Sequence, residues 1–160
     1  MSIGIFGETA FTETFSSCTG TFGWSGNVAT GTFNTDNSGW TVSNAYGAGG
    51  SAKFGTGSKL GTAQTPAISC GAATTATLTF KAGAWNGSSE STNLKLSFTN
   101  CSGDKSSVTL VKGSFTSYTV ALSSISGNIK ITFSGKAASN SRFLLDDVVV
   151  TYEVSSSCSS

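Results

Sequence analysis

Histidine is absent from this 160-residue chain, and charged residues make up only 11% of it. Without histidine the chain lacks the commonest general base, the Ser-His and Cys-His nucleophile pairs and most zinc ligand sets. Two of its eight carboxylates could form a glycosidase pair, but none lies in a recognisable acid–base motif. We therefore expect a protein that is not an enzyme.

The chain also has little net charge and no long apolar run. A net charge of +1 gives no electrostatic footprint for nucleic acid or an anionic membrane, and no segment is apolar enough for membrane insertion as a helix. The segment Met1 to Phe6 is too short and uncharged to be a signal peptide. We expect an extracellular or cell-surface protein whose signal was removed, or one that leaves by another route, such as on a virion surface.

Four cysteines are present, Cys18, Cys70, Cys101 and Cys158, and none forms a CxxC pair. This spacing argues against a zinc or redox site. Disulfides in an oxidising compartment and reduced thiols in loops both remain open. Because Cys158 lies in a Ser-rich segment, an intermolecular bond would form easily there, and self-assembly through the termini is one alternative.

Glycine, serine and threonine dominate, and short runs of alternating apolar and polar residues predict an all-β chain. The predicted strands are 40–46, 52–54, 76–84, 94–98, 108–111, 118–122, 129–133 and 143–154. Their regular spacing favours an antiparallel β-sandwich with jelly-roll topology. We divide the chain into an N-terminal extension (1–10), the jelly-roll β-sandwich domain (11–154) and a Ser-rich C-terminal tail (155–160), with long loops over 17–39.

Two acids interrupt apolar strand faces near the ends of this domain. Glu13 alternates with Phe11 and Phe15, and Asp146 is expected to share a face with Leu144 and Val148. A bare charge on such a face is costly, so each carboxylate needs a partner or a cation. If the first and last strands are neighbours, the two acids converge, and their oxygens suit Ca²⁺.

The structural calcium site predicted in this way has four candidate ligands. They are Glu13, Asp146, a backbone carbonyl, either of Lys53 or of the loop 34–37, and, as a weaker candidate expected on the opposite face, Asp147. The alternative is that the carboxylates accept hydrogen bonds from backbone amides or pair with Lys or Arg.

Several aromatic residues lie where a sugar ring could stack on them. Concave sites with an aromatic platform and a few polar groups suit carbohydrates. We predict Trp24, in a glycine-rich loop, Tyr46, at a strand end, and Trp85, on an outer strand face, as this platform. Asn86 and Glu90 follow Trp85 and are the predicted polar contacts. The alternative for Trp24 and Trp85 is a lid over the edge of the sandwich.

Four short strings carry a resemblance to a known pattern. They are Gly39-Trp40-Thr41, Ala52-Lys53-Phe54-Gly55, Thr65-Pro66-Ala67-Ile68 and Phe143-Leu144-Leu145-Asp146-Asp147-Val148, preceded by Glu13-Thr14-Phe15. Together they resemble the galactose-binding-like jelly rolls of carbohydrate-binding modules and of adhesion-type domains appended to secreted bacterial proteins. The resemblance covers residues 11 to 154. It implies a structural calcium at Asp146, joined by Glu13.

We therefore expect a non-catalytic, extracellular carbohydrate-binding module, with a glycan or polysaccharide as its partner. The alternative is a structural subunit of an extracellular assembly, such as a virion decoration or fibre protein or a pilus-like filament. Members of the family that it resembles are usually attached to an enzyme or an anchor, and this chain carries neither, which favours the assembly alternative.

Overall fold

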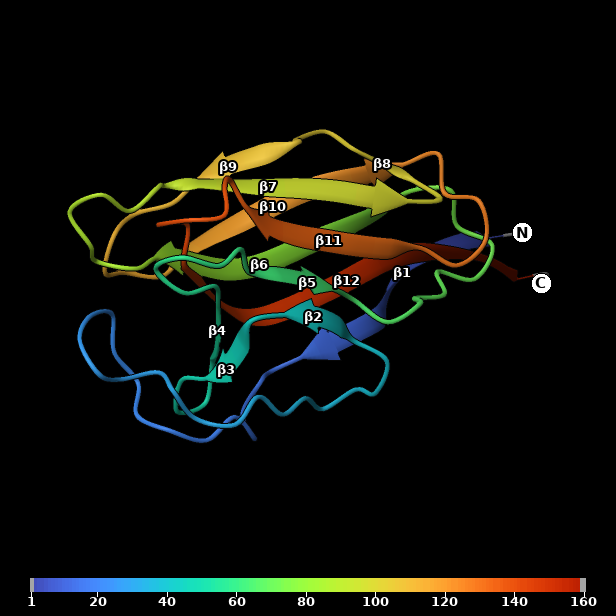
Figure 1. Cartoon of the computed structure of the whole chain (residues 1–160). Coiled ribbons are helices and arrows are strands. Elements are labelled where there is room, and N and C mark those ends of the chain that lie inside the picture. The colour runs from blue at the N-terminus through green and yellow to red at the C-terminus, as the bar shows by residue number, and fades with distance from the viewer. Residues whose placement is uncertain (1, 159–160) are drawn as a thin grey trace.

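The computed structural model describes residues 2–158, with the side chains of residues 4–155, and forms a two-sheet antiparallel β-sandwich (Figure 1). In spatial order, sheet A contains β3 (Ala45–Gly47), β4 (Ala52–Phe54), β12 (Phe143–Cys158), β6 (Ala76–Ala84), β10 (Thr116–Ser123) and β8 (Ser102–Gly103), and β1 (Ser2–Glu13) pairs with β12. Sheet B contains β2 (Thr41–Ser43), β5 (Thr62–Gln64), β11 (Lys130–Gly135), β7 (Asn93–Thr99) and β9 (Ser107–Thr109). This strand order is consistent with a jelly roll. None of residues 2–158 forms a helix that is long and apolar enough to cross a membrane.

The alternating runs of the sequence become strands, as predicted. β4 and β6 have the predicted bounds, and the predicted strand 143–154 extends to Cys158. The predicted strand 40–46 is divided into β2 and β3, which belong to different sheets. The break lies at Asn44, whose φ of 52° is a left-handed conformation that asparagine tolerates better than most residues.

The core lies between the two sheets and is built from apolar residues at alternate positions of the strands. Leu78 and Phe80 of β6 are buried, as are Leu94 of β7 and Ile131 and Phe133 of β11. On β6 the intervening residues are exposed or half-buried up to Lys81, as the period of two requires. Aromatic rings continue the core, with Phe80 and Phe133 edge to face at 5.0 Å.

A β-bulge in β12 changes which side chains face this core. The pairing of β12 with β6 shifts between Asp146 and Val149, and Asp147 has a φ of 48°. Before the bulge, Leu144 packs on the outer face of sheet A; after it, Val148 packs in the core between the sheets. The prediction that Leu144, Asp146 and Val148 share one face is therefore wrong, because an extra residue in a strand reverses the alternation.

The two ends of the chain pair with each other. β1 and β12 run antiparallel from Ser2↔Cys158 to Glu13↔Val148, with a register shift at residues 9–11. Figure 1 shows the far part of this pair projecting beyond the sandwich. The segments 1–10 and 155–160, expected as an extension and a tail outside the domain, thus contribute strand residues over their described parts.

A long loop over residues 14–40 contains the predicted loop 17–39, and its middle part packs on the outer face of sheet A. Its middle is fixed to β3, since Gly31 and Gly47 exchange both backbone hydrogen bonds at 2.9 Å. Neither position has room for a side chain: a Cβ on Gly31 would lie 2.2 Å from the Thr19 carbonyl oxygen, and one on Gly47 2.4 Å from that of Thr32. The loop is therefore held close to the sheet.

Candidate functional site

The outer face of sheet A presents one row of residues from four neighbouring segments. Tyr46 of β3 is opposite Lys53 of β4, Lys53 is opposite Leu144 of β12, and Leu144 is opposite Gly83 of β6. Directly paired residues lie on the same face of a sheet, so these four positions form a line across it. The glycine leaves room for Trp24 of the long loop, whose ring lies 2.6 Å from where a Cβ of Gly83 would be.

Trp85 follows β6, and its ring lies close to two cations of this face, Lys53 and Arg142. The Lys53 ammonium is 4.2 Å from the centroid of the Trp85 ring, and the Arg142 guanidinium carbon is 5.4 Å from it. Lys53 Nζ also lies 5.7 Å from the centroid of the Tyr46 ring. A cation within about 6 Å of an aromatic face is attracted by its quadrupole, and desolvation strengthens the attraction. The cluster thus combines two cations with two aromatic rings.

Arg142 is locked in place by Glu90. The guanidinium donates from Nη2 to Glu90 Oε1 at 2.7 Å and from Nε to Oε2 at 3.0 Å, and the Arg142 backbone N–H donates to Oε2 at 2.7 Å. The Glu90 side chain is only 1% exposed, so Arg142 compensates its charge in place of solvent. A bidentate pair of this geometry is strong and directional, and it fixes the guanidinium beside Trp85.

Three aromatic rings lie beside this cluster at the surface. Phe22 and Trp24 come from the long loop, and Phe115 precedes β10. Phe22 is edge to face with Trp24 at 5.6 Å and stacked on Phe115 at 6.0 Å, and Trp24 contacts Phe115 at 4.9 Å. Phe22 is 46% exposed and the other two are half-buried. We call these three residues the aromatic trio.

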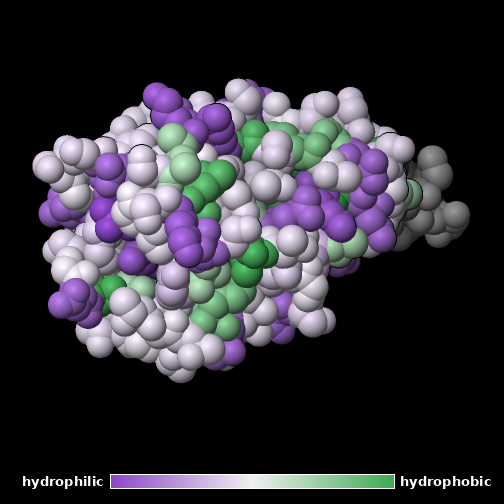
Figure 2. Space-filling view, in the orientation of Figure 1, coloured by the Kyte–Doolittle hydropathy of each residue, from purple (hydrophilic) through white to green (hydrophobic). Residues whose placement is uncertain are grey.

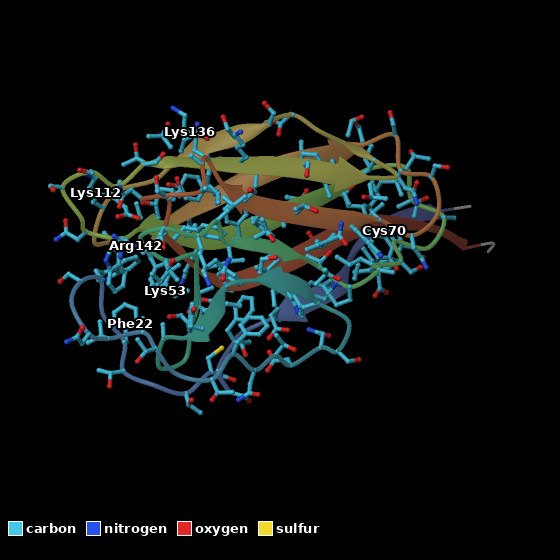
Figure 3. The ribbon with its side chains drawn as sticks, in the orientation of Figure 1. Phe22, Lys53, Cys70, Lys112, Lys136 and Arg142 are labelled. Atoms are coloured by element: carbon cyan, nitrogen blue, oxygen red, sulfur yellow. The ribbon has the colours of Figure 1, made fainter. Side chains whose placement is uncertain are left out.

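Figure 3 locates Phe22 of the trio and the two cations on the molecule. Figure 3 places Phe22, Lys53, Arg142 and Lys112 toward the same end of the sandwich, away from Cys70 and the termini. In Figure 2 the hydrophobic surface on the face in view is divided into separate patches among weakly polar residues.

The structure brings the predicted ligand-binding residues together from distant parts of the sequence. Trp24 accepts a backbone hydrogen bond from Asn86 at 2.8 Å, and Tyr46, Trp85 and Glu90 contact Lys53 or Arg142 as described. The expected exposure of Trp85 is wrong, because its ring is only 4% exposed and packs with Ala29, Ala48 and Leu144. Trp85 thus belongs to a buried layer on the outer face of sheet A, and Trp24 lies partly buried over that layer.

Sequence reasoning missed Phe22, Phe115 and Arg142, and it gave Lys53 a different role. Phe22 lies two residues from Trp24 in the same glycine-rich loop, so that pairing was a usable signal. Lys53 stands between two apolar residues in a three-residue strand and is only 7% exposed. No sequence pattern indicates that Arg142 reaches Glu90 across 52 residues.

Glu13, the first predicted calcium ligand, is fully buried and surrounded by N–H groups. Oε2 accepts from the backbone of Phe15 at 3.1 Å and of Asp36 at 2.7 Å. Oε1 accepts from the Asn37 backbone at 3.1 Å, from Asn37 Nδ2 at 3.1 Å and from Trp40 Nε1 at 3.0 Å. These five donors approach the full acceptor capacity of a carboxylate, so the hydrogen-bond alternative accounts for its burial.

Asp146 is the less satisfied acid. It lies on the outer face of sheet A opposite Lys81, and the only hydrogen bond within the described residues is the one that its Oδ1 accepts from the Asp147 backbone at 2.9 Å. Burial raises the pKa of Asp146 to about 6, and the charges of Asp147 and Glu13 add to the rise. Asp147 pairs with Lys81 Nζ at 3.2 Å, so the bulge places it on the Lys81 side, not on the opposite face.

No group of three or more His, Cys, Asp or Glu side chains is placed to hold a metal ion among the described residues. Lys53 is enclosed by strands on both sides, one row away from Asp146. Its carbonyl is thus part of the sheet. Calcium stays a prediction, which Asp146 supports better than Glu13 does.

The cysteines whose side chains are described carry free thiols. Cys18 donates to the Asn34 carbonyl at 3.1 Å, and burial raises the pKa of the thiols of Cys18, Cys70 and Cys101. The Cys158 side chain lies outside the described residues.

A comparison with protein-family models and with curated proteins finds no match to this chain.

Glu13→Gln should destabilise the protein. The amide nitrogen of glutamine cannot accept, so at least one of the five N–H groups would face another donor, and the loss should be about 1–3 kcal/mol in the free energy of unfolding. Urea denaturation measures it. Glu8→Gln is the matched control, since Glu8 is an exposed glutamate of the same strand. An equal, small change in both variants would contradict the role given to Glu13.

Asp146→Asn should make stability less dependent on pH. The folded-state pKa of about 6 lies above the unfolded value, so this carboxyl lowers stability as pH rises from about 4 to 6. At pH 7 the variant should be more stable than the wild type, because it carries no charge that burial disfavours. Solvent screens a half-buried carboxyl, which limits this gain to on the order of 1–2 kcal/mol. Thermal unfolding between pH 4 and 7 measures the difference.

The same pair of proteins tests calcium. If Ca²⁺ binds at Asp146, adding it should raise the melting temperature of the wild type and not of Asp146→Asn. If the melting temperatures of the two proteins respond equally to calcium and to chelator, the prediction of calcium at Asp146 is wrong.

Proposed function

We propose that this chain is a non-catalytic carbohydrate-binding module of the cell exterior, with jelly-roll topology. The observation that supports it best is the aromatic trio of Phe22, Trp24 and Phe115. Sugar rings have apolar C–H faces, and aromatic side chains at a surface offer the flat, apolar partner that those faces need.

Rigidity of the loop supports the proposal further. Trp24 rests on Gly83, and the loop that carries it is fixed to β3 at Gly31 and to Glu13 through residues 36–40. A platform that is ordered before the ligand arrives loses less conformational entropy on binding. Asn86, whose backbone N–H donates to the Trp24 carbonyl, has an exposed side chain that can bond sugar hydroxyls.

Trp24→Ala should weaken polysaccharide binding at least tenfold, about 1.4 kcal/mol, while Trp24→Phe keeps part of it. Retardation in affinity gels that contain a panel of soluble polysaccharides measures binding. Val154→Ala is the control, because Val154 is exposed on the projecting part of β12. A wild type that migrates freely in every gel, or a Trp24→Ala variant that is retarded as much as the wild type, would exclude the proposal.

The second candidate is a structural subunit of an extracellular assembly, such as a virion decoration or filament protein. It is favoured by the projecting β1–β12 pair, which carries Ile5, Phe6 and Val154 exposed at 66%, 56% and 37%. Strand edges without a neighbour are templates for pairing with another chain. Light scattering at rising protein concentration should then show growing assemblies, and a constant monomer mass with and without calcium would count against this candidate.

A further inference from the structure

Lys53 is a buried cation without an anionic or hydrogen-bonding partner among the described residues. The residue is 7% exposed, and its ammonium makes its recorded contacts with the rings of Trp85 and Tyr46, at 4.2 and 5.7 Å. None of the hydrogen bonds or salt bridges within residues 2–158 involves its Nζ. An ammonium has three N–H donors, so this group keeps unused bonding capacity.

The charges around Lys53 do not balance. Arg142 and Glu90 neutralise each other through their bidentate pair, which leaves the Lys53 charge uncompensated. Burial lowers the pKa of Lys53, the charge of Arg142 lowers it further, and Glu90 opposes them. A buried charge is stabilised by an opposite charge at hydrogen-bond distance, and the residues that the structure describes supply none here.

The Lys53 ammonium is nevertheless not completely sealed from solvent. Every side-chain nitrogen or oxygen that is sealed from solvent in the described part of the chain has a hydrogen-bond partner, so Nζ, which has none, is not sealed. Lys53 is two strands from Gly83, on which Trp24 rests, a distance of about 10 Å across the sheet. A ligand that covers the aromatic trio and extends about two strands along this row would meet the Lys53 position.

We propose that Lys53 binds an anionic substituent of the glycan, a carboxylate or a sulfate ester, while a sugar ring of the same chain stacks on the aromatic trio. The ligand class is thus an acidic polysaccharide. This inference rests on the proposed carbohydrate binding and adds the charge of the ligand to it. Trp85 and Tyr46 hold the ammonium in position, and Arg142, already paired with Glu90, does not compete for the anion.

The test compares charged and uncharged forms of the same polymers. Polygalacturonate is paired with its fully methyl-esterified form, and dextran sulfate with dextran, in about 0.15 M salt so that exposed charges are screened beyond about 8 Å. The wild type should bind at least one charged polymer tenfold more tightly than its neutral counterpart. The polygalacturonate arm identifies a carboxylate, and the dextran sulfate arm a sulfate ester.

Two variants locate the effect. Lys53→Met keeps the length of the side chain and should reduce the preference to about twofold or less, whereas Lys95→Met, on the exposed side of β7, should keep it. A preference that survives Lys53→Met overturns the inference. Equal binding of charged and neutral polymers also overturns it and leaves the carbohydrate-binding proposal standing, while binding of no polymer overturns both.

A measurement on the unmutated side chain covers the case in which Lys53→Met does not fold. Lysines of the wild type are reductively methylated with ¹³C-formaldehyde, and the Lys53 signal is assigned by its absence in Lys53→Arg. Adding the preferred charged polymer should shift the Lys53 signal, and the neutral form should not. A Lys53 signal that stays in place while the polymer binds overturns the inference.

Discussion

The outer face of sheet A and the loop that covers it depend on the hydrogen bonds to the buried carboxylate of Glu13. A charge at a fully buried position is tolerable only when it is surrounded by donors, and four of its five N–H groups belong to Phe15 and to residues 36–37 of the long loop. The fifth comes from Trp40, whose ring contacts Phe11 and Phe15 at 5.9 and 5.3 Å. Polar and apolar contacts thus fix both ends of the loop at one point.

The outer face of sheet A is consequently a second, small apolar layer with charges inserted into it. Leu144 and Trp85 form its floor with two alanines, and the loop covers that floor with Trp24 and Phe22. Packing of this kind excludes water from most of the layer, which strengthens the attraction between the Lys53 ammonium and the Trp85 ring. The same packing that stabilises the loop therefore also concentrates an unbalanced positive charge beside the exposed rings.

Much of the fold is predictable from the sequence, because β4 and β6 have clear alternation and strong turn signals at their ends. The side of the sheet on which Val148 lies is not predictable from the sequence. It depends on a bulge at Asp147, where one residue has a positive φ, and this bulge leaves the alternation of residue types unchanged. In the site, the sequence shows that Glu13 is an acid on an apolar strand face. Its hydrogen-bond donors come from a loop without periodicity, so the sequence does not predict them. The approach of Lys53 to Trp85 depends on which strands become neighbours, and local patterns do not specify that.

The pairing of Ser2 with Cys158 places the two ends of the chain side by side, at the end of the sandwich away from Phe22 and Lys53 (Figures 1 and 3). Polypeptide joined to either end would therefore leave the aromatic face unobstructed. Because the ends are neighbours, the whole unit could also be inserted into a surface loop of a host protein with little distortion of that loop. The points at which other polypeptide would be attached and the exposed rings thus lie at opposite ends of the sandwich, so the domain could be joined to different proteins.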